Sequence, residues 1–120
     1  MKRWVGLAAL FAACIGSNGA WAQGTLRIGM VAGFSGPVAG LVQESAEGAK
    51  LYFDSVNAQG GIKGQTIELV TQDDKYQPAL AAAGAKALAA QGALALILSR
   101  GTGPTEAMLP ALKENKLPLI

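Results

Sequence analysis

The sequence predicts an α/β fold, in which a parallel β-sheet carries helices on its faces. Short apolar stretches alternate with longer stretches of helical periodicity from about residue 24 onward. A polar or glycine-rich loop follows each of the first three apolar stretches, and a proline then stands near the next helix start: Pro37, Pro78 and Pro104. Because proline is tolerated in the first helical turn, this repeated order predicts right-handed β–α–β units.

The first predicted unit runs from Gly24 to Gly61. Its strand, residues 26–31, is mainly apolar and is bounded by glycine on both sides. Apolar residues then recur at gaps of four and three, the period of one buried helical face: Val42, Ala46, Ala49, Phe53 and Val56. The run 57–61, NAQGG, ends this helix with glycine where a left-handed cap is needed.

The remaining segments repeat the alternation. Residues 66–70 form a second predicted strand, and an alanine-rich helix follows over 78–91. The uninterrupted apolar run 93–98 is typical of a strand that helices cover on both faces. A third helix is predicted over 104–115, and residues 117–120 open a fourth strand.

This architecture predicts where a ligand binds. In parallel sheets ligands bind beyond the carboxyl ends of the strands, so we expect functional residues in the loops 33–37, 73–78 and 99–104. The third loop, SRGTGP, offers two hydroxyls and the free N–H groups of a helix that begins at Pro104. Such a positive helix end suits a carboxylate ligand, although Thr102 could simply cap the helix.

Catalytic patterns are absent from the sequence. It contains no histidine, which excludes a Ser-His-Asp triad and a histidine metal site within these residues. The run 33–37, GFSGP, lacks a spacer residue of the G-x-S-x-G nucleophile elbow. Asp73 and Asp74 could be metal ligands or an acid/base pair, but we favour turn residues that accept from backbone N–H groups. We therefore predict no enzyme activity, no metal site and no cofactor.

Residues 1–22 are predicted to be a cleavable signal peptide. Two basic residues precede an apolar run over 4–15, and the small residues Ala20 and Ala22 predict cleavage after position 22. The apolar run is shorter than the roughly 20 residues that span a bilayer. Cys14 raises the alternative of a lipid attachment site, but Phe11 occupies a position where that signal needs a small or aliphatic residue. We expect export to the periplasm.

The charge pattern argues against nucleic-acid binding. The chain has ten basic and eight acidic residues, and loss of Lys2 and Arg3 with the signal peptide leaves eight of each. The remaining basic residues are scattered along the chain, so no basic patch is predicted.

Three further motifs are residues 28–39, IGMVAGFSGPVA; residues 56–64, VNAQGGIKG; and the aspartates of 73–78, DDKYQP. Together they resemble the leucine/isoleucine/valine-binding family of type I periplasmic binding proteins. The resemblance covers 23–120 and implies Rossmann-like parallel sheets in two lobes that a hinge joins. Residues 23–120 then form an incomplete N-terminal lobe, and we expect a fragment because the chain ends within an apolar run.

The resemblance also implies a binding site. The loop after the third strand would hold the carboxylate of an amino acid, and the first loop would line the cleft mouth. The matching positions are Ser99, Gly101, Thr102 and Gly103 in the third loop, with Ser35 and Leu41 at the mouth. The family often carries an aromatic residue at the position of Leu41, so its absence puts a branched-chain ligand in doubt.

The resemblance finally implies capture without chemistry. A monomeric solute-binding protein would bind an amino acid, or a related small carboxylate or amide, and deliver it to the membrane permease of an ABC-type importer. Two alternatives use other partners or other chemistry. The same fold serves as a ligand-sensing module of signalling systems, and an exported hydrolase would need a catalytic base that these residues lack.

Overall fold

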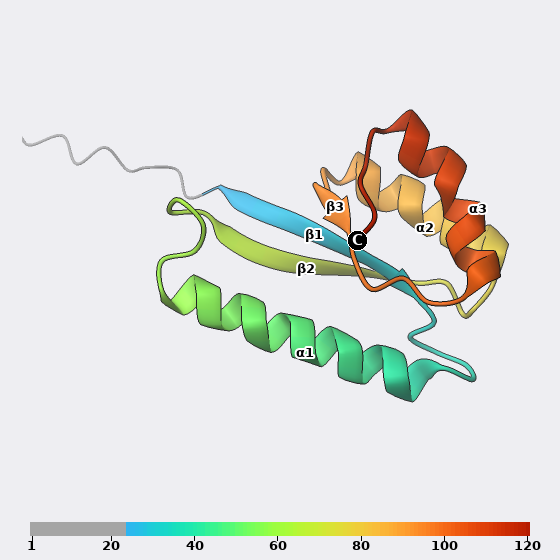
Figure 1. The fold of residues 1–120 in the computed structure, drawn as a ribbon, viewed down its shortest axis with the longest axis horizontal. Helices are drawn as coiled ribbons and strands as arrows, with labels where there is room; N and C mark the ends of the chain where they lie inside the picture. The colour runs from blue at the N-terminus through green and yellow to red at the C-terminus, as the bar shows by residue number, and fades with distance from the viewer. Residues whose placement is uncertain (1–23) are drawn as a thin grey trace, which may run out of the picture.

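The computed structural model describes residues 24–120, so the predicted signal peptide and Cys14 lie outside the described residues. The chain alternates strands and helices as predicted (Figure 1): β1 (Thr25–Ala32), α1 (Ala39–Ala58), β2 (Thr66–Asp73), α2 (Pro78–Ala90), β3 (Ala95–Leu96) and α3 (Thr102–Glu114). Within residues 24–120, none of the helices combines the length and the apolar character that a membrane span requires.

The strands form one parallel sheet in the order β2-β1-β3. Strand β1 pairs with β2 along its whole length, from Thr25 opposite Thr66 to Ala32 opposite Asp73. On its other side, β1 pairs with β3, with Ile28 opposite Ala95 and Gly29 opposite Leu96. Because all three strands run in the same direction, their carboxyl ends and the loops that follow lie at one edge of the sheet (Figure 1).

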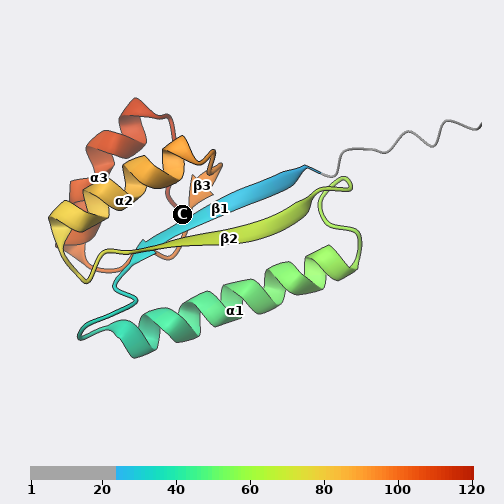
Figure 2. The same ribbon diagram turned by 180° about the vertical axis from the view of Figure 1, so that it is seen from behind.

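Helices cover both faces of the sheet. Helix α1 lies on one face, and α2 and α3 lie together on the other, as the two opposite views show (Figures 1 and 2). Met30 and Ala32 of β1 pack with Val42 of α1, whereas Val31 packs with α2 and α3. This alternation follows from the period of two along a strand, and it explains why the last four residues of β1 are all buried.

Gly29 lets α2 and β3 approach the central strand. A Cβ atom at this position would lie 2.4 Å from Leu96 Cδ2 and 2.8 Å from Leu88 Cδ1. Both leucines are fully buried, so the space is already filled by side chains that cannot move away cheaply.

The third strand is shorter than its apolar run predicts. We expected a strand over 93–98, but only Ala95 and Leu96 form it, and Leu94 and Leu98 are exposed. Leu98 has φ 54°, which no strand residue adopts, so the chain turns away there. Strand β3 still forms a parallel bridge from Leu96 to Leu119, which places the start of the predicted fourth strand beside it.

Helix α3 begins two residues earlier than predicted. Gly101, with φ 94°, is the N-cap, and Thr105 N donates to Gly101 O at 3.0 Å. Pro104 therefore occupies the third helical position, where its missing N–H costs nothing. The alternative that Thr102 caps the helix is wrong, because Thr102 is its first residue and makes no capping hydrogen bond.

Two hydrogen bonds of the Asn57 side chain connect the end of α1 to the start of β2. Its Oδ1 atom accepts from Ile67 N at 2.8 Å, and its Nδ2 atom donates to Ile67 O at 2.8 Å. Both hydrogen bonds are partly buried. Through them, the amide side chain pairs with the outer edge of β2 as a residue of a neighbouring strand would.

Replacing Asn57 by alanine should lower the free energy of unfolding by about 2 kcal/mol, because two partly buried backbone groups of Ile67 lose their partners. Urea unfolding followed by circular dichroism measures the change. Gln59→Ala is the matched control, since this exposed amide bonds only within its own helix to Ser55. Equal effects of the two substitutions would contradict the role of Asn57.

Candidate functional site

Three loops meet at the carboxyl edge of the sheet. The loop after β2 joins the loop after β1, since Asp74 N donates to Ala32 O at 3.1 Å and Tyr76 N lies 3.2 Å from where a Cβ of Gly33 would stand. The same loop reaches the start of α3, where the ring of Tyr76 covers Gly101. The prediction that the loops after the first three strands share one edge is therefore confirmed.

A short hydrogen bond links the first loop to the end of β2. Ser35 Oγ donates to Asp73 Oδ2 at 2.6 Å, and Ser35 N donates to Asp73 Oδ1 at 3.2 Å. The Ser35 hydroxyl lowers the pKa of Asp73; partial desolvation opposes this effect, and the N–H of Lys75 adds to it. The hydroxyl of Ser35, a residue that the family resemblance places at the cleft mouth, thus already donates its proton to a carboxylate.

Asp74 is fully buried beneath the second loop. Its Oδ1 atom accepts from Tyr76 N at 2.7 Å, and its carbonyl accepts from Gln77 N at 2.7 Å. Its Oδ2 atom has no hydrogen-bond partner among the described residues. Burial raises the pKa of Asp74, the bond from Tyr76 N opposes the rise, and the charge of Asp73 adds to it.

The two aspartates are turn residues, as we favoured. Each carboxylate accepts from the backbone N–H two residues further along the chain, at Lys75 and Tyr76. Residues 24–120 contain no cluster of three or more metal-ligating side chains.

Tyr76 is a site residue that sequence reasoning missed. Lys75 and Tyr76 both adopt left-handed backbone conformations, with φ 49° and 61°. This unusual turn directs the tyrosine ring onto the start of α3, where a Cβ on Gly101 would lie 2.7 Å from Cε2 of the ring. The sequence offered one signal for it, an aromatic residue inside a loop already singled out.

The third loop surrounds the N-terminus of α3. Ser99 Oγ lies 3.3 Å from Thr105 Oγ1, so the two hydroxyls share a hydrogen bond across the first helical turn. Thr102 and Gly103 form the exposed start of the helix, and neither N–H donates to an acceptor within residues 24–120. The helix dipole adds a positive potential at this point.

The predicted site residues are therefore partly brought together. Ser99, Gly101, Thr102 and Gly103 gather at the start of α3. Ser35 belongs to the same edge through its bond to the end of β2. Leu41 is 54% exposed and lies on the first turn of α1, the helix that covers the opposite face of the sheet from α3 (Figure 1).

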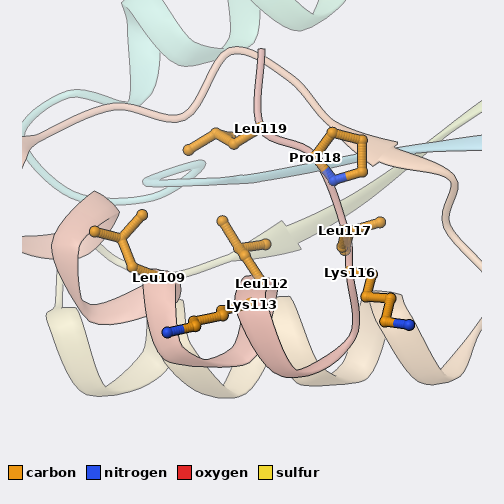
Figure 3. A pocket seen from close by; sticks show the side chains of 7 residues that line it. All are labelled: Leu109, Leu112, Lys113, Lys116, Leu117, Pro118 and Leu119. Atoms are coloured by element: carbon orange, nitrogen blue, oxygen red, sulfur yellow. The ribbon is translucent and has the colours of Figure 1, made fainter.

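A separate hollow of about 640 Å³ lies away from these loops, between α3 and the segment that follows it (Figure 3). Its walls are mainly leucine and proline side chains, with two lysines at the rim: Leu109, Leu112, Lys113, Lys116, Leu117, Pro118 and Leu119. Apart from those two lysines, the lining side chains are apolar.

The bond between Ser35 and Asp73 predicts a pH-dependent contribution to stability. The pKa of Asp73 is lowered in the folded state, so the bond stabilises above the unfolded value of 3.8 and is lost as the pH falls through the folded pKa. We expect Ser35→Ala to cost about 0.5 kcal/mol at neutral pH, because both groups are exposed, and nothing in strong acid. Urea unfolding at several pH values measures this.

Ser45→Ala is the control for that experiment. Ser45 Oγ donates to the neutral carbonyl of Leu41 at 2.8 Å, so its removal should have the same effect at every pH. A cost of Ser35→Ala that stays constant between neutral and strongly acidic pH would contradict the link to Asp73.

Comparison with known proteins agrees with this fold. A family model described as periplasmic binding protein matches residues 25–120. The Leu/Ile/Val-binding protein of Escherichia coli (strain K12) is 37% identical over 87 residues, which cover 70% of this chain and 23% of that protein. The chain spans between 17% and 28% of the length of the curated relatives that it matches.

Solved structures show the same arrangement. The branched-chain amino acid transporter substrate-binding protein of Streptococcus pneumoniae, in complex with isoleucine, is similar with a TM-score of 0.73 and 33% identity, covering 79% of this chain and 28% of that one. A solute-binding protein of an ABC transporter from R. palustris, in complex with benzoate, has a TM-score of 0.67 and 31% identity, covering 80% and 26%. The chain therefore belongs to the periplasmic binding protein family, as its resemblance to the type I, Leu/Ile/Val-binding members implied.

Proposed function

We propose that this protein is the solute-binding component of an ABC-type importer and captures an amino acid or a related small carboxylate or amide. One observation carries the proposal. At the carboxyl edge of the sheet, the N-terminus of α3 presents unpaired N–H groups and a threonine hydroxyl beside an aromatic ring. This is the kind of receptor that a carboxylate needs.

The start of α3 concentrates its free donors on two residues. Pro104 has no N–H and Thr105 N already bonds to Gly101 O, so the donors that remain belong to Thr102 and Gly103. We infer that these two N–H groups and the Thr102 hydroxyl bind a ligand carboxylate. Ser99 supports the first helical turn through its contact with Thr105.

The ligand is proposed by its chemistry. The two similar solved structures hold isoleucine and benzoate, which share a carboxylate on an apolar group. Amides present a carbonyl oxygen to the same donors. Leu41, on the first turn of α1, is proposed with Ser35 at the cleft mouth, and its exposed side chain is expected to provide an aliphatic contact there.

Capture is proposed to work by closure rather than by chemistry. Residues 1–22 would direct export and be removed after Ala22, and residues 23–120 would form part of the first of two lobes. A ligand that bridges both lobes stabilises the closed form, which then docks on the membrane permease. We propose a monomer without cofactor or catalytic group, acting in the periplasm.

Thermal unfolding of the full-length mature protein against amino acids, simple amides and aromatic acids tests this function. A compound that binds only the folded state should add about 2.7 kcal/mol at a hundred times its Kd. Thr102→Ala should remove most of that gain, whereas Thr25→Ala, at the opposite end of the strands, should keep it. The proposal fails if no compound in the panel raises the unfolding midpoint.

A further inference from the structure

We propose that Tyr76 is a specificity-determining residue of this site, and that its ring packs against the ligand group that carries the carboxylate, favouring a planar aromatic acid. The inference rests on the proposed capture of small carboxylates. It adds Tyr76 as a ligand contact in the second loop, where the strand order predicts functional residues without naming one.

The position of the ring makes this contact possible. Cε2, Cζ and Oη of Tyr76 lie 2.7, 3.0 and 3.1 Å from where a Cβ of Gly101 would stand. Gly101 directly precedes Thr102, whose N–H is the first free donor of α3. A carboxylate bound at Thr102 therefore places its substituent beside the tyrosine ring, which is 40% exposed and so still offers surface to a ligand.

The ring is held in this position before any ligand arrives. Asp74 Oδ1 accepts from Tyr76 N at 2.7 Å, and the absence of a side chain at Gly33 leaves room for that backbone segment. Residues 75 and 76 are both left-handed, a conformation that L-residues rarely adopt and that clusters at binding sites. A fixed ring loses little conformational freedom when a ligand binds, which favours affinity.

Tyr76 also has no competitor in this part of the molecule. The first turn of α1 presents Leu41 rather than an aromatic residue, and Phe34 of the first loop packs against the core on the α1 side. Tyr52 and Phe53 lie in the middle of α1, far along the chain from its N-terminal end. Among the described residues, Tyr76 is thus the aromatic side chain that covers the start of α3. Two aromatic rings in offset or edge-to-face contact gain stabilisation beyond the area that they bury, and an aliphatic group against the same ring lacks this gain.

Two matched pairs of probes test the inference on the full-length mature protein. Benzoate and isovalerate carry only a carboxylate, whereas L-phenylalanine and L-leucine add an ammonium group. Isothermal titration measures the Kd of each probe. In each pair, Tyr76→Leu should raise the Kd of the aromatic probe about tenfold and that of the aliphatic probe by less than about threefold. Tyr76→Phe keeps the ring and should keep the aromatic preference, and Tyr52→Leu, an exposed tyrosine on α1, should change nothing.

The outcomes separate this inference from the proposed function. If the wild type binds none of the four probes or any other small carboxylate or amide, the proposed function itself fails. If the wild type binds but Tyr76→Leu leaves both affinity ratios unchanged, or if the wild type binds only aliphatic members, the function stands and the role of Tyr76 is refuted. Should Tyr76→Leu not fold, nuclear Overhauser contacts between benzoate and the Tyr76 ring in the wild type decide, and contacts to Tyr52 instead would refute the role.

Discussion

The parallel pairing of β1 with a strand on each side is the constraint on which the rest of the structure depends. It aligns the carboxyl ends of β1, β2 and β3, so that loops distant in the sequence meet at one edge. Gly29 permits this pairing to be tightly packed, because any side chain there would displace Leu88 and Leu96. The two helical layers then bury β1 from both faces and fix the direction in which each loop leaves the sheet.

Two unfavourable features of the chain lie close together at that edge. Asp74 is buried with one oxygen unpartnered among the described residues, and two consecutive residues after it are left-handed. Hydrogen bonds from Tyr76 N and Gln77 N offset part of this cost. Concentrated strain of this kind is typical of sites that must hold a side chain ready for a ligand, which agrees with the placement of Tyr76 against Gly101.

The sequence predicted the elements with regular periodicity and missed those set by tertiary contacts. The buried face of α1 and the parallel order followed from apolar spacing, because burial and helical geometry leave the same period in the chain. The early end of β3 could not be predicted in this way, because the apolar run 93–98 does not reveal that the backbone of Leu98 is left-handed. The family resemblance implied that Gly101 contacts the ligand. In the structure, Gly101 is the N-cap of α3, and its lack of a side chain leaves room for the Tyr76 ring. That contact joins residues 25 positions apart and could not be found locally.

Hydrogen–deuterium exchange of the full-length mature protein, with and without a ligand that stabilises it, tests the central claim most directly. If the carboxyl edge of the sheet is the ligand site, the ligand should slow exchange at the N–H groups of Thr102 and Gly103 and in the loop 74–77. Exchange in the hollow formed by α3 and residues 116–119 should not change. Protection confined to that hollow, with none at the start of α3, would contradict the account.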